Sequence, residues 1–183
     1  MLEFLPEDDP RLRQPSQKIG HKLTKNQQRM IVKVCKKLES MPEAMAIAAP
    51  QVGIPLRFFV ARRNPSEMMV VVNPEIVDIL PDKYFIDPEG NPILRERSEW
   101  EECLSFPGRE FLVSRHVAIK IKFETERGIQ KSFIVTGHDS LVFQHEMDHL
   151  DGILIDQKCQ DIRNIEEEEV DIDVKNGLSN IGG

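Results

Sequence analysis

A short run near the carboxyl-terminal end, His145-Glu146-Met147-Asp148-His149, is the feature that most constrains the fold of this chain. The two histidines are four residues apart, so on an α-helix both imidazoles project from the same face and can bind one metal ion. Glu146 lies beside them, where it can act as general base toward a water molecule at that ion. The run therefore predicts a helix enclosed by other elements, and it favours metal-assisted hydrolysis.

Length and charge indicate a single globular domain followed by a different kind of segment. The chain has 183 residues, of which 40% are hydrophobic and 30% charged, enough for one domain with a proper core. The formal net charge is -7, and no broad basic field suggests direct binding of nucleic acid. Residues 165–183 hold six acidic residues and one lysine. We therefore expect a folded domain over residues 1–164 and an acidic, flexible tail over residues 165–183.

The cysteines and the start of the chain bear on the compartment. Cys35, Cys103 and Cys159 are widely spaced without a CxxC pair, which favours a reducing compartment over a disulfide framework. Cys35 lies on an apolar helical stripe and is expected in the core. The first residues resemble no signal or transit peptide, and no apolar run approaches the ~18 residues that span a membrane. We expect a cytoplasmic protein with no membrane partner.

Hydrophobic periodicity predicts both helices and strands. One helix begins after Thr24, where Gln27 completes a capping box, and ends at Pro42. Residues 81–100 should form a long surface connection with room for one strand. The expected strands are 57–61, 68–72 (closed by Asn73-Pro74), 117–123 and 129–136. Gly137 should break the last strand, and Asp139 should cap the helix that carries the two histidines. The fold class is therefore α+β, with largely antiparallel sheets around a central metal-binding helix.

A catalytic metal site usually has three protein ligands, so the pair of histidines needs a third. In the long thermolysin-like pattern this would be a glutamate about twenty residues further on, within Glu166–Glu169. The pattern with a third histidine finds none in residues 151–155. The remaining strong candidate is Cys103, because a thiolate is a soft anionic donor. A lone cysteine is otherwise a core residue, and spacing alone leaves the choice open.

Three segments of the chain resemble motifs of the peptide deformylases. Residues 101–105 (EECLS) are similar to the family's EGCLS motif, residues 144–150 (QHEMDHL) to QHExDHL, and residues 44–51, which end in AAPQ, to GxGxAAPQ. The motifs occur in the family's order, within a resemblance that covers about residues 4–157. Ala44, Ala46 and Glu102 stand where the family has glycine.

The resemblance implies a metal-dependent hydrolase that removes the N-formyl group from the N-terminal formyl-Met of newly made polypeptides and releases formate. The folded part is then a deformylase-like catalytic domain. The implied ligands of one divalent metal ion are Cys103, His145 and His149. Fe²⁺ is the expected metal, with Zn²⁺ or Ni²⁺ as substitutes. The implied catalytic groups are the Glu146 carboxylate as general base and, as oxyanion hole, the Gln51 side-chain amide and the Leu104 backbone N–H.

Supporting roles are also implied by the resemblance. Met45, Ala46 and Glu102 are expected beside the substrate, with the Glu102 side chain at the rim of the groove. Glu101 should orient a ligand histidine and Arg115 should hold Glu101, although an ordinary surface role for Arg115 is an equally good interpretation. Because acidic residues oppose contact with ribosomal RNA, docking at the ribosome is not carried over. Two alternatives stay open: a general HExxH zinc peptidase, and a deformylase-like metal protein that binds peptides without turnover.

Overall fold

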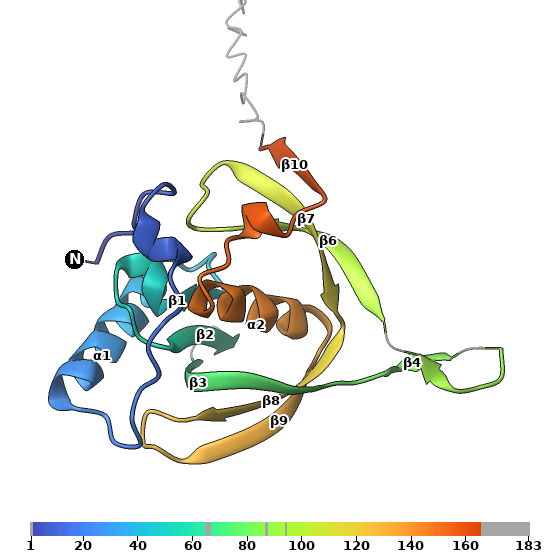
Figure 1. The fold of residues 1–183 in the computed structure, drawn as a ribbon, viewed down its shortest axis with the longest axis horizontal. Coiled ribbons are helices and arrows are strands. Elements are labelled where there is room, and N and C mark those ends of the chain that lie inside the picture. The colour runs from blue at the N-terminus through green and yellow to red at the C-terminus, as the bar shows by residue number, and fades with distance from the viewer. Residues whose placement is uncertain (1, 65–66, 87, 94, 166–183) are drawn as a thin grey trace, which may run out of the picture.

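Two antiparallel sheets enclose one helix, and a second helix lies against the outside of the larger sheet (Figure 1). The computed structural model describes residues 2–64, 67–86, 88–93 and 95–165. The helices are α1 (Lys25–Glu39) and α2 (Gly137–Leu150), with short 3₁₀ helices η1 (Pro10–Arg13), η2 (Ala49–Val52) and η3 (Ile155–Gln157). The strands are β1 (Ala46–Ala48), β2 (Phe58–Asn64), β3 (Glu67–Ile79), β4 (Asp82–Ile86), β5 (Pro92–Ile93), β6 (Glu96–Glu102), β7 (Arg109–His116), β8 (Ala118–Glu124), β9 (Gln130–Thr136) and β10 (Asp161–Asn164).

The strand order places the sheets on two sides of α2. The larger sheet has the order β1-β2-β3-β8-β9 and the smaller one the order β10-β7-β6, while β4 and β5 form a separate hairpin that projects from the body (Figure 1). Every pairing between these described strands is antiparallel. The predicted α+β class, with antiparallel sheets around a central helix, is confirmed.

Apolar packing fixes α2 in the centre. Phe143 of α2 meets Phe59 of β2 edge to face, with ring centroids 5.0 Å apart, and Met147 and Leu150 join the same buried cluster. A second buried cluster lies between α1 and strands β1 and β2. A third lies beneath the smaller sheet and includes Cys103. Because buried aromatic and aliphatic side chains stabilise a fold by about 1.5–3 kcal/mol each, α2 is held rigidly between the sheets.

The first helix begins as predicted and ends earlier. Thr24 accepts the backbone N–H of Gln27, and the Gln27 side chain accepts the backbone N–H of Thr24, which completes the capping box. The helix ends at Glu39, where the Ser40 hydroxyl donates to the Lys37 carbonyl at 2.7 Å. The predicted end at Pro42 was wrong because that serine satisfies a terminal carbonyl before the proline is reached. Cys35 is half-buried and packs against the α1 cluster.

The strand expected to close at Asn73-Pro74 continues through both residues to Ile79. Asn73 adopts φ 51°, and the register between β3 and β8 shifts between Val72 and Glu75. A bulge of this kind leaves the proline nitrogen outside the ladder, so proline does not end the strand. The Asn73 side chain also accepts the backbone N–H of Ile19 and donates to its carbonyl, at 2.8 and 2.7 Å.

Two further expectations need correction. Residues 81–100 are not a connection with one strand, because β4, β5 and most of β6 lie in them. Asp139 does not cap α2: the helix starts at Gly137, directly after β9, with Thr136 at the cap position and Asp139 in the first turn. Gly137 has φ 61°, a conformation that favours glycine and turns the strand straight into the helix. None of the described helices is long and apolar enough to cross a membrane.

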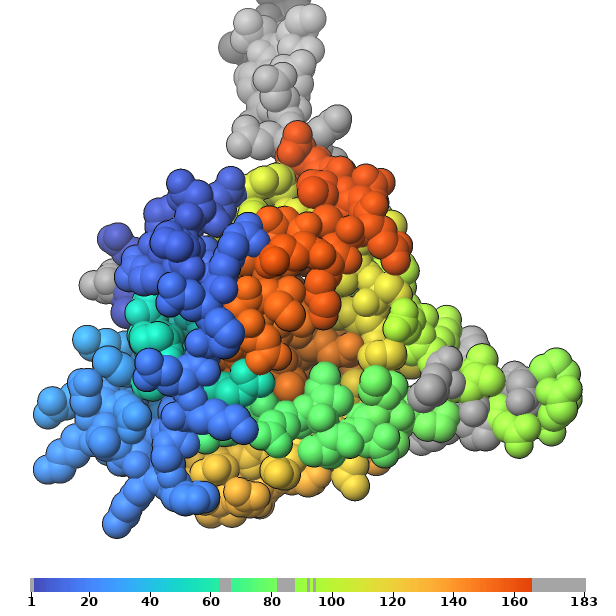
Figure 2. Space-filling view, in the orientation of Figure 1, coloured from blue at the N-terminus to red at the C-terminus, as the bar shows by residue number. Residues whose placement is uncertain are grey.

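The segments before α1 and after α2 meet on the surface, where Figure 2 shows the blue amino-terminal region against the orange-red region. The backbone N–H of Ser16 donates to the Leu150 carbonyl at 2.8 Å, and Arg13 pairs with Asp156. The chain then returns as β10 to pair with β7. Beyond Ile165, the tail expected over residues 165–183 lies outside the described residues.

Candidate functional site

The helix α2 carries His145, Glu146 and His149 on its buried side. The four-residue spacing places the imidazole rings of His145 and His149 with centroids 5.0 Å apart. His149 is 1% exposed and Glu146 is 5% exposed. The helix is held in place by Gln144, whose side chain accepts the backbone N–H of His116 and donates to its carbonyl at the end of β7. Sequence reasoning gave Gln144 no separate role, although it belongs to the motif.

Cys103 reaches these histidines from the other side. It follows the last residue of β6 and begins a tight turn in which the Phe106 backbone N–H donates to the Cys103 carbonyl at 2.8 Å. Its sulfur lies 3.3 Å from His149 Nε2. The ligand atoms of Cys103, His145 and His149 all lie within 4.8 Å of one another, and no other such group of three occurs among the described residues. Residues 166–169, the alternative source of a third ligand, lie outside the described residues.

The electrostatics of these three residues suit a metal ion. Burial by itself raises the pKa of the Cys103 thiol, but His149 and His145 lower that pKa well below its ordinary value. Burial by itself lowers the pKa of His145, whereas Cys103 and Glu101 raise it. The site thus stabilises an anionic sulfur beside a positive charge. A divalent cation bound by one thiolate and two imidazoles meets the same electrostatic demand, so the residues fit a metal.

A chain of buried contacts orients His145. Glu101 Oε2 lies 2.9 Å from His145 Nδ1, and Arg115 donates to both oxygens of Glu101, at 2.5 and 3.0 Å. Arg115 is 3% exposed, so the surface interpretation of this arginine was wrong. It also donates to Asp148 at 2.8 Å, and Asp148 accepts a second bond from Lys158. Burial raises the pKa of Glu101, yet the bonds from His145 and Arg115 lower it overall. With Nδ1 bound to Glu101, His145 presents Nε2 to a metal.

The Gln51 amide is oriented by the backbone. Its oxygen accepts the Ala48 N–H at 2.9 Å, so its nitrogen points the other way, 3.9 Å from the Cys103 sulfur and 3.3 Å from the Ser105 hydroxyl. Gln51 is 1% exposed and belongs to η2. Ser105 was not singled out from the sequence, although it lies in the same motif as Cys103. The amide therefore presents its hydrogen-bond donors beside the Cys103 sulfur, one of the three candidate metal ligands.

These residues open into a groove with a volume of about 1040 Å³. Met45 and Ala46 line the groove at the start of β1, and Glu102, Cys103 and Leu104 line it at the end of β6 and in the turn that follows. Glu102 is exposed, which places it at the rim. Phe4, which no sequence motif singled out, also lines the groove. Glu146 also lines the groove; one oxygen of its carboxylate is buried without a hydrogen-bond partner among the described residues, and burial raises the pKa of this carboxyl group.

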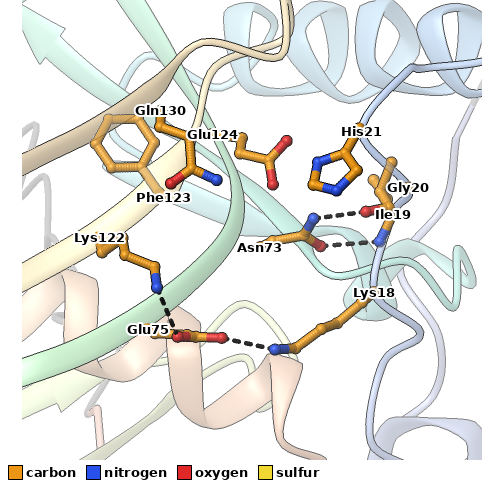
Figure 3. A pocket seen from close by; sticks show the side chains of 10 residues that line it. All are labelled: Lys18, Ile19, Gly20, His21, Asn73, Glu75, Lys122, Phe123, Glu124 and Gln130. Carbon is orange, nitrogen blue, oxygen red and sulfur yellow. Dashed lines mark hydrogen bonds and ion pairs between the residues drawn. The ribbon is translucent and has the colours of Figure 1, made fainter.

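A second, smaller hollow of about 250 Å³ lies at the β3 bulge (Figure 3). Two carboxylates, Glu75 and Glu124, line it together with His21. Glu75 is paired with Lys18 at 2.6 Å and Lys122 at 3.6 Å, and chiefly the bond from Lys18 lowers its pKa. Asn73 is bound to Ile19 within the same hollow. These contacts pin the amino-terminal segment to the sheet, and the donor atoms here do not form a group of three close enough to hold a metal ion among the described residues.

Comparison with known proteins shows which family has a sequence like this one. The family model for polypeptide deformylase matches residues 1–165. A peptide deformylase of Thermotoga maritima is 39% identical over 152 residues, covering 80% of each chain, and one of Desulforudis audaxviator is 31% identical over 156 residues, covering 84% of this chain and 90% of the relative.

Solved structures agree with this family. The crystal structure of the Thermotoga maritima peptide deformylase has a TM-score of 0.74 at 32% identity, with 88% of this chain and 99% of that chain covered. A peptide deformylase from Synechococcus elongatus in complex with actinonin has a TM-score of 0.74 at 25% identity, with 87% and 79% covered. The chain therefore belongs to the polypeptide deformylase family, metal-dependent hydrolases that remove the N-formyl group from newly made polypeptides.

Proposed function

We propose that Cys103, His145 and His149 hold one divalent metal ion in this deformylase, and that Glu146, Gln51 and the backbone of Leu104 carry out its chemistry. The single observation that supports this most is the convergence of the three donor atoms within 4.8 Å, beside the Gln51 amide nitrogen. Fe²⁺ is the proposed native metal, with Zn²⁺ or Ni²⁺ able to take its place. A thiolate with two imidazoles is a donor set that suits all three ions.

Each residue has a defined task in the proposed reaction. The metal, when bound, acts as a Lewis acid and lowers the pKa of an adjacent water molecule. Glu146 accepts a proton from water as the water oxygen bonds to the formyl carbon, and it returns that proton to the methionine nitrogen as the C–N bond breaks. Gln51 Nε2 and the Leu104 N–H donate to the carbonyl oxygen while negative charge develops on it. The products are formate and a free amino terminus.

The substrate lies, in this proposal, along the groove between Met45, Ala46 and Glu102. Met45 is 42% exposed and offers an apolar surface for the formylated methionine. The backbones at Ala46 and Glu102 are placed to pair with an extended peptide, as exposed strand edges do. Glu101 and Arg115 act indirectly, by fixing the ring of His145.

The wider setting of the enzyme is also a proposal. We infer a cytoplasmic location from the widely spaced cysteines, and a catalytic domain over residues 1–164 followed by an acidic tail that takes no part in catalysis. Ribosome docking through that tail is not proposed, because glutamates repel ribosomal RNA. The substrates are N-formylmethionyl peptides or nascent chains, with no direct contact to nucleic acid.

The test is formate release from formyl-Met-Ala-Ser by anaerobically prepared, Fe²⁺-loaded protein. Turnover should be lost in Glu146→Ala while the metal stays bound, and Glu126→Ala, on an exposed turn outside the groove, serves as the matched control. Cys103→Ala should lose the metal. Absence of formate release from folded, metal-replete protein would refute the assignment. Retained metal and cleavage of unformylated peptides by Cys103→Ala would favour a general zinc peptidase, and unchanged peptide handling by Glu146→Ala would favour a peptide-binding protein.

A further inference from the structure

The groove is acidic. Its lining contains several glutamates and, among the described residues, neither lysine nor arginine. The lining carboxylates that already have a cationic partner are Glu99 with Arg97, Glu101 with Arg115, and Glu110 with Arg163. The side chains of Glu43 and Glu102 have no hydrogen bond or ion pair within the described part of the chain, and both residues are exposed. These two charges are therefore available to a ligand in the groove.

The strand register adds a specific constraint on Glu102. It stands directly opposite Glu110 in the pairing of β6 with β7, so the two side chains share one face of the sheet. Like charges in directly opposed positions destabilise a sheet by repulsion. A cation placed beside Glu102 would relieve that repulsion, and a ligand in the groove can supply one because both glutamates line the groove and Glu102 is exposed.

Arg163, the arginine on the strand next to β7, forms its ion pair, within the described part of the chain, with Glu110 and not with Glu102. Arg163 of β10 pairs with Glu110 in the register of the small sheet and donates to Glu110 at 2.7 Å. Its guanidinium also lies over the Trp100 ring, 4.1 Å from the ring centroid, which holds it by a cation–π contact. Arg163 thus reaches across β7 to Trp100 of β6, but its acidic partner is Glu110, and it forms no ion pair with Glu102 among the described residues.

Two other cations touch aromatic residues of the groove without lining it. Lys37 lies over the Phe4 ring and Arg109 over the Phe106 ring, each 5.0 Å from the centroid. Arg109 is also paired with Glu7. Neither contacts Glu43 or Glu102 through any hydrogen bond or ion pair of the described residues.

We propose that Glu102, assisted by Glu43 on the wall before β1, selects formyl-Met substrates that carry lysine or arginine at the second or third residue. This inference rests on the proposed function of the groove and names the substrate class that the groove prefers. A basic side chain gains an ionic contact with Glu102, the member of the opposed pair that has no cationic partner among the described residues. An acidic side chain at the same place would add a third like charge. The contacts are exposed, so the preference should be modest and sensitive to salt.

The test compares kcat/KM for matched peptides with the metal-loaded enzyme. The pairs are formyl-Met-Ala-Lys against formyl-Met-Ala-Glu, and formyl-Met-Lys-Ala against formyl-Met-Glu-Ala, each at low and high salt. We expect the wild type to favour lysine in at least one pair, and Glu102→Gln to reduce that ratio by about two- to five-fold. Glu43→Gln should reduce it less, and the double variant should reduce it most. Glu126→Gln is the control that neutralises a carboxylate outside the groove and should leave the ratio unchanged.

A second measurement separates this inference from the catalytic assignment. The affinities of the products Met-Ala-Lys and Met-Ala-Glu, measured by calorimetry with wild type and Glu102→Gln, require no turnover. Loss of turnover on neutral formyl-Met-Ala-Ser would refute the catalytic proposal, whereas the charge preference would still appear in product binding. A wild-type ratio of one in both kinetics and product binding, or a ratio that the double variant leaves unchanged, would overturn the preference for basic residues.

Discussion

Replacing Arg115 with methionine removes the buried charge that links β7 to α2. Arg115 donates to Glu101 and Asp148, and its side chain is 2% exposed. Removing one partner of a buried ion pair commonly costs about 3–5 kcal/mol, because the other charge stays buried without compensation. Here Asp148 keeps Lys158 at 2.7 Å and Glu101 keeps His145. We therefore expect the lower end of that range, about 3 kcal/mol of unfolding free energy.

The same substitution should weaken metal binding. Without Arg115, Glu101 loses the two bonds that fix its carboxylate, so the ring of His145 is less well oriented. Loss of such an orienting contact typically costs 10- to 100-fold, or about 1.4–2.7 kcal/mol, in metal affinity or activity. Stability is measured by urea unfolding of chelator-treated protein, and metal affinity by competition with a chromophoric chelator. Separating the two measurements prevents metal binding from masking the change in stability.

Two further variants make the result interpretable. Arg13→Met breaks a pair with Asp156 in which both side chains are at least 32% exposed, and should cost less than ~1 kcal/mol. Arg115→Lys retains the charge but cannot reproduce the forked contact to Glu101 together with the bond to Asp148, so it should fall between wild type and Arg115→Met. If Arg115→Met matched Arg13→Met in both stability and metal affinity, the buried network would not be what holds His145.

Three shorter predictions concern the backbone, the metal and the tail. Gly152 has φ +73°, and a Cβ there would lie 2.7 Å from the Gln14 backbone. Gly152→Ala should therefore lower the free energy of unfolding in urea by about 3 kcal/mol or more, whereas Gly90→Ala, where nothing lies within 4 Å, should lower it by about 1–2 kcal/mol. Equal losses in the two variants would contradict the close approach at Gly152. Fe²⁺-loaded enzyme should lose activity in air while Ni²⁺-loaded enzyme does not, because a thiolate beside iron is exposed to oxidation; equal half-lives would count against iron. Truncation after Ile165, which keeps its backbone bond to Gly108, should leave the melting temperature and turnover nearly unchanged, and a large fall in either would show that the tail contributes to the folded domain.

Local sequence patterns were enough to predict the helices and strands that depend only on residues close together in the chain. The capping box at Thr24 and Gln27 marked the start of α1, and the alternation around Ile119 and Ile121 marked β8 with its one buried face. These signals depend on hydrogen bonds and burial within a few residues of chain. The end of β3 was misread because an asparagine with positive φ lets a proline sit in a bulge, and the residue letters do not reveal that conformation.

Contacts between distant segments could not be read in the same way. The position of Phe4 in the groove and the opposition of Glu102 to Glu110 both depend on how separate segments are paired and packed. Register is set by the whole sheet, and a slip of one residue would move every side chain to the other face. The sequence placed Glu102 at the rim through a family resemblance, but the like-charge pair becomes visible only with the register in hand.

Strand β7, which is not among the strands expected from the sequence, lies next to the candidate site. Its buried positions include Phe111, Val113 and Arg115, so a charged residue interrupts what would otherwise be an apolar alternation. That arginine is buried because Glu101 and Asp148 compensate it, and those contacts in turn orient the histidine proposed to bind the metal. Arg115 thus has two effects: it breaks the apolar alternation by which β7 could have been predicted, and it holds the residues that orient His145. Natural chains commonly depart from local folding rules where function requires it, and Arg115 is such a departure.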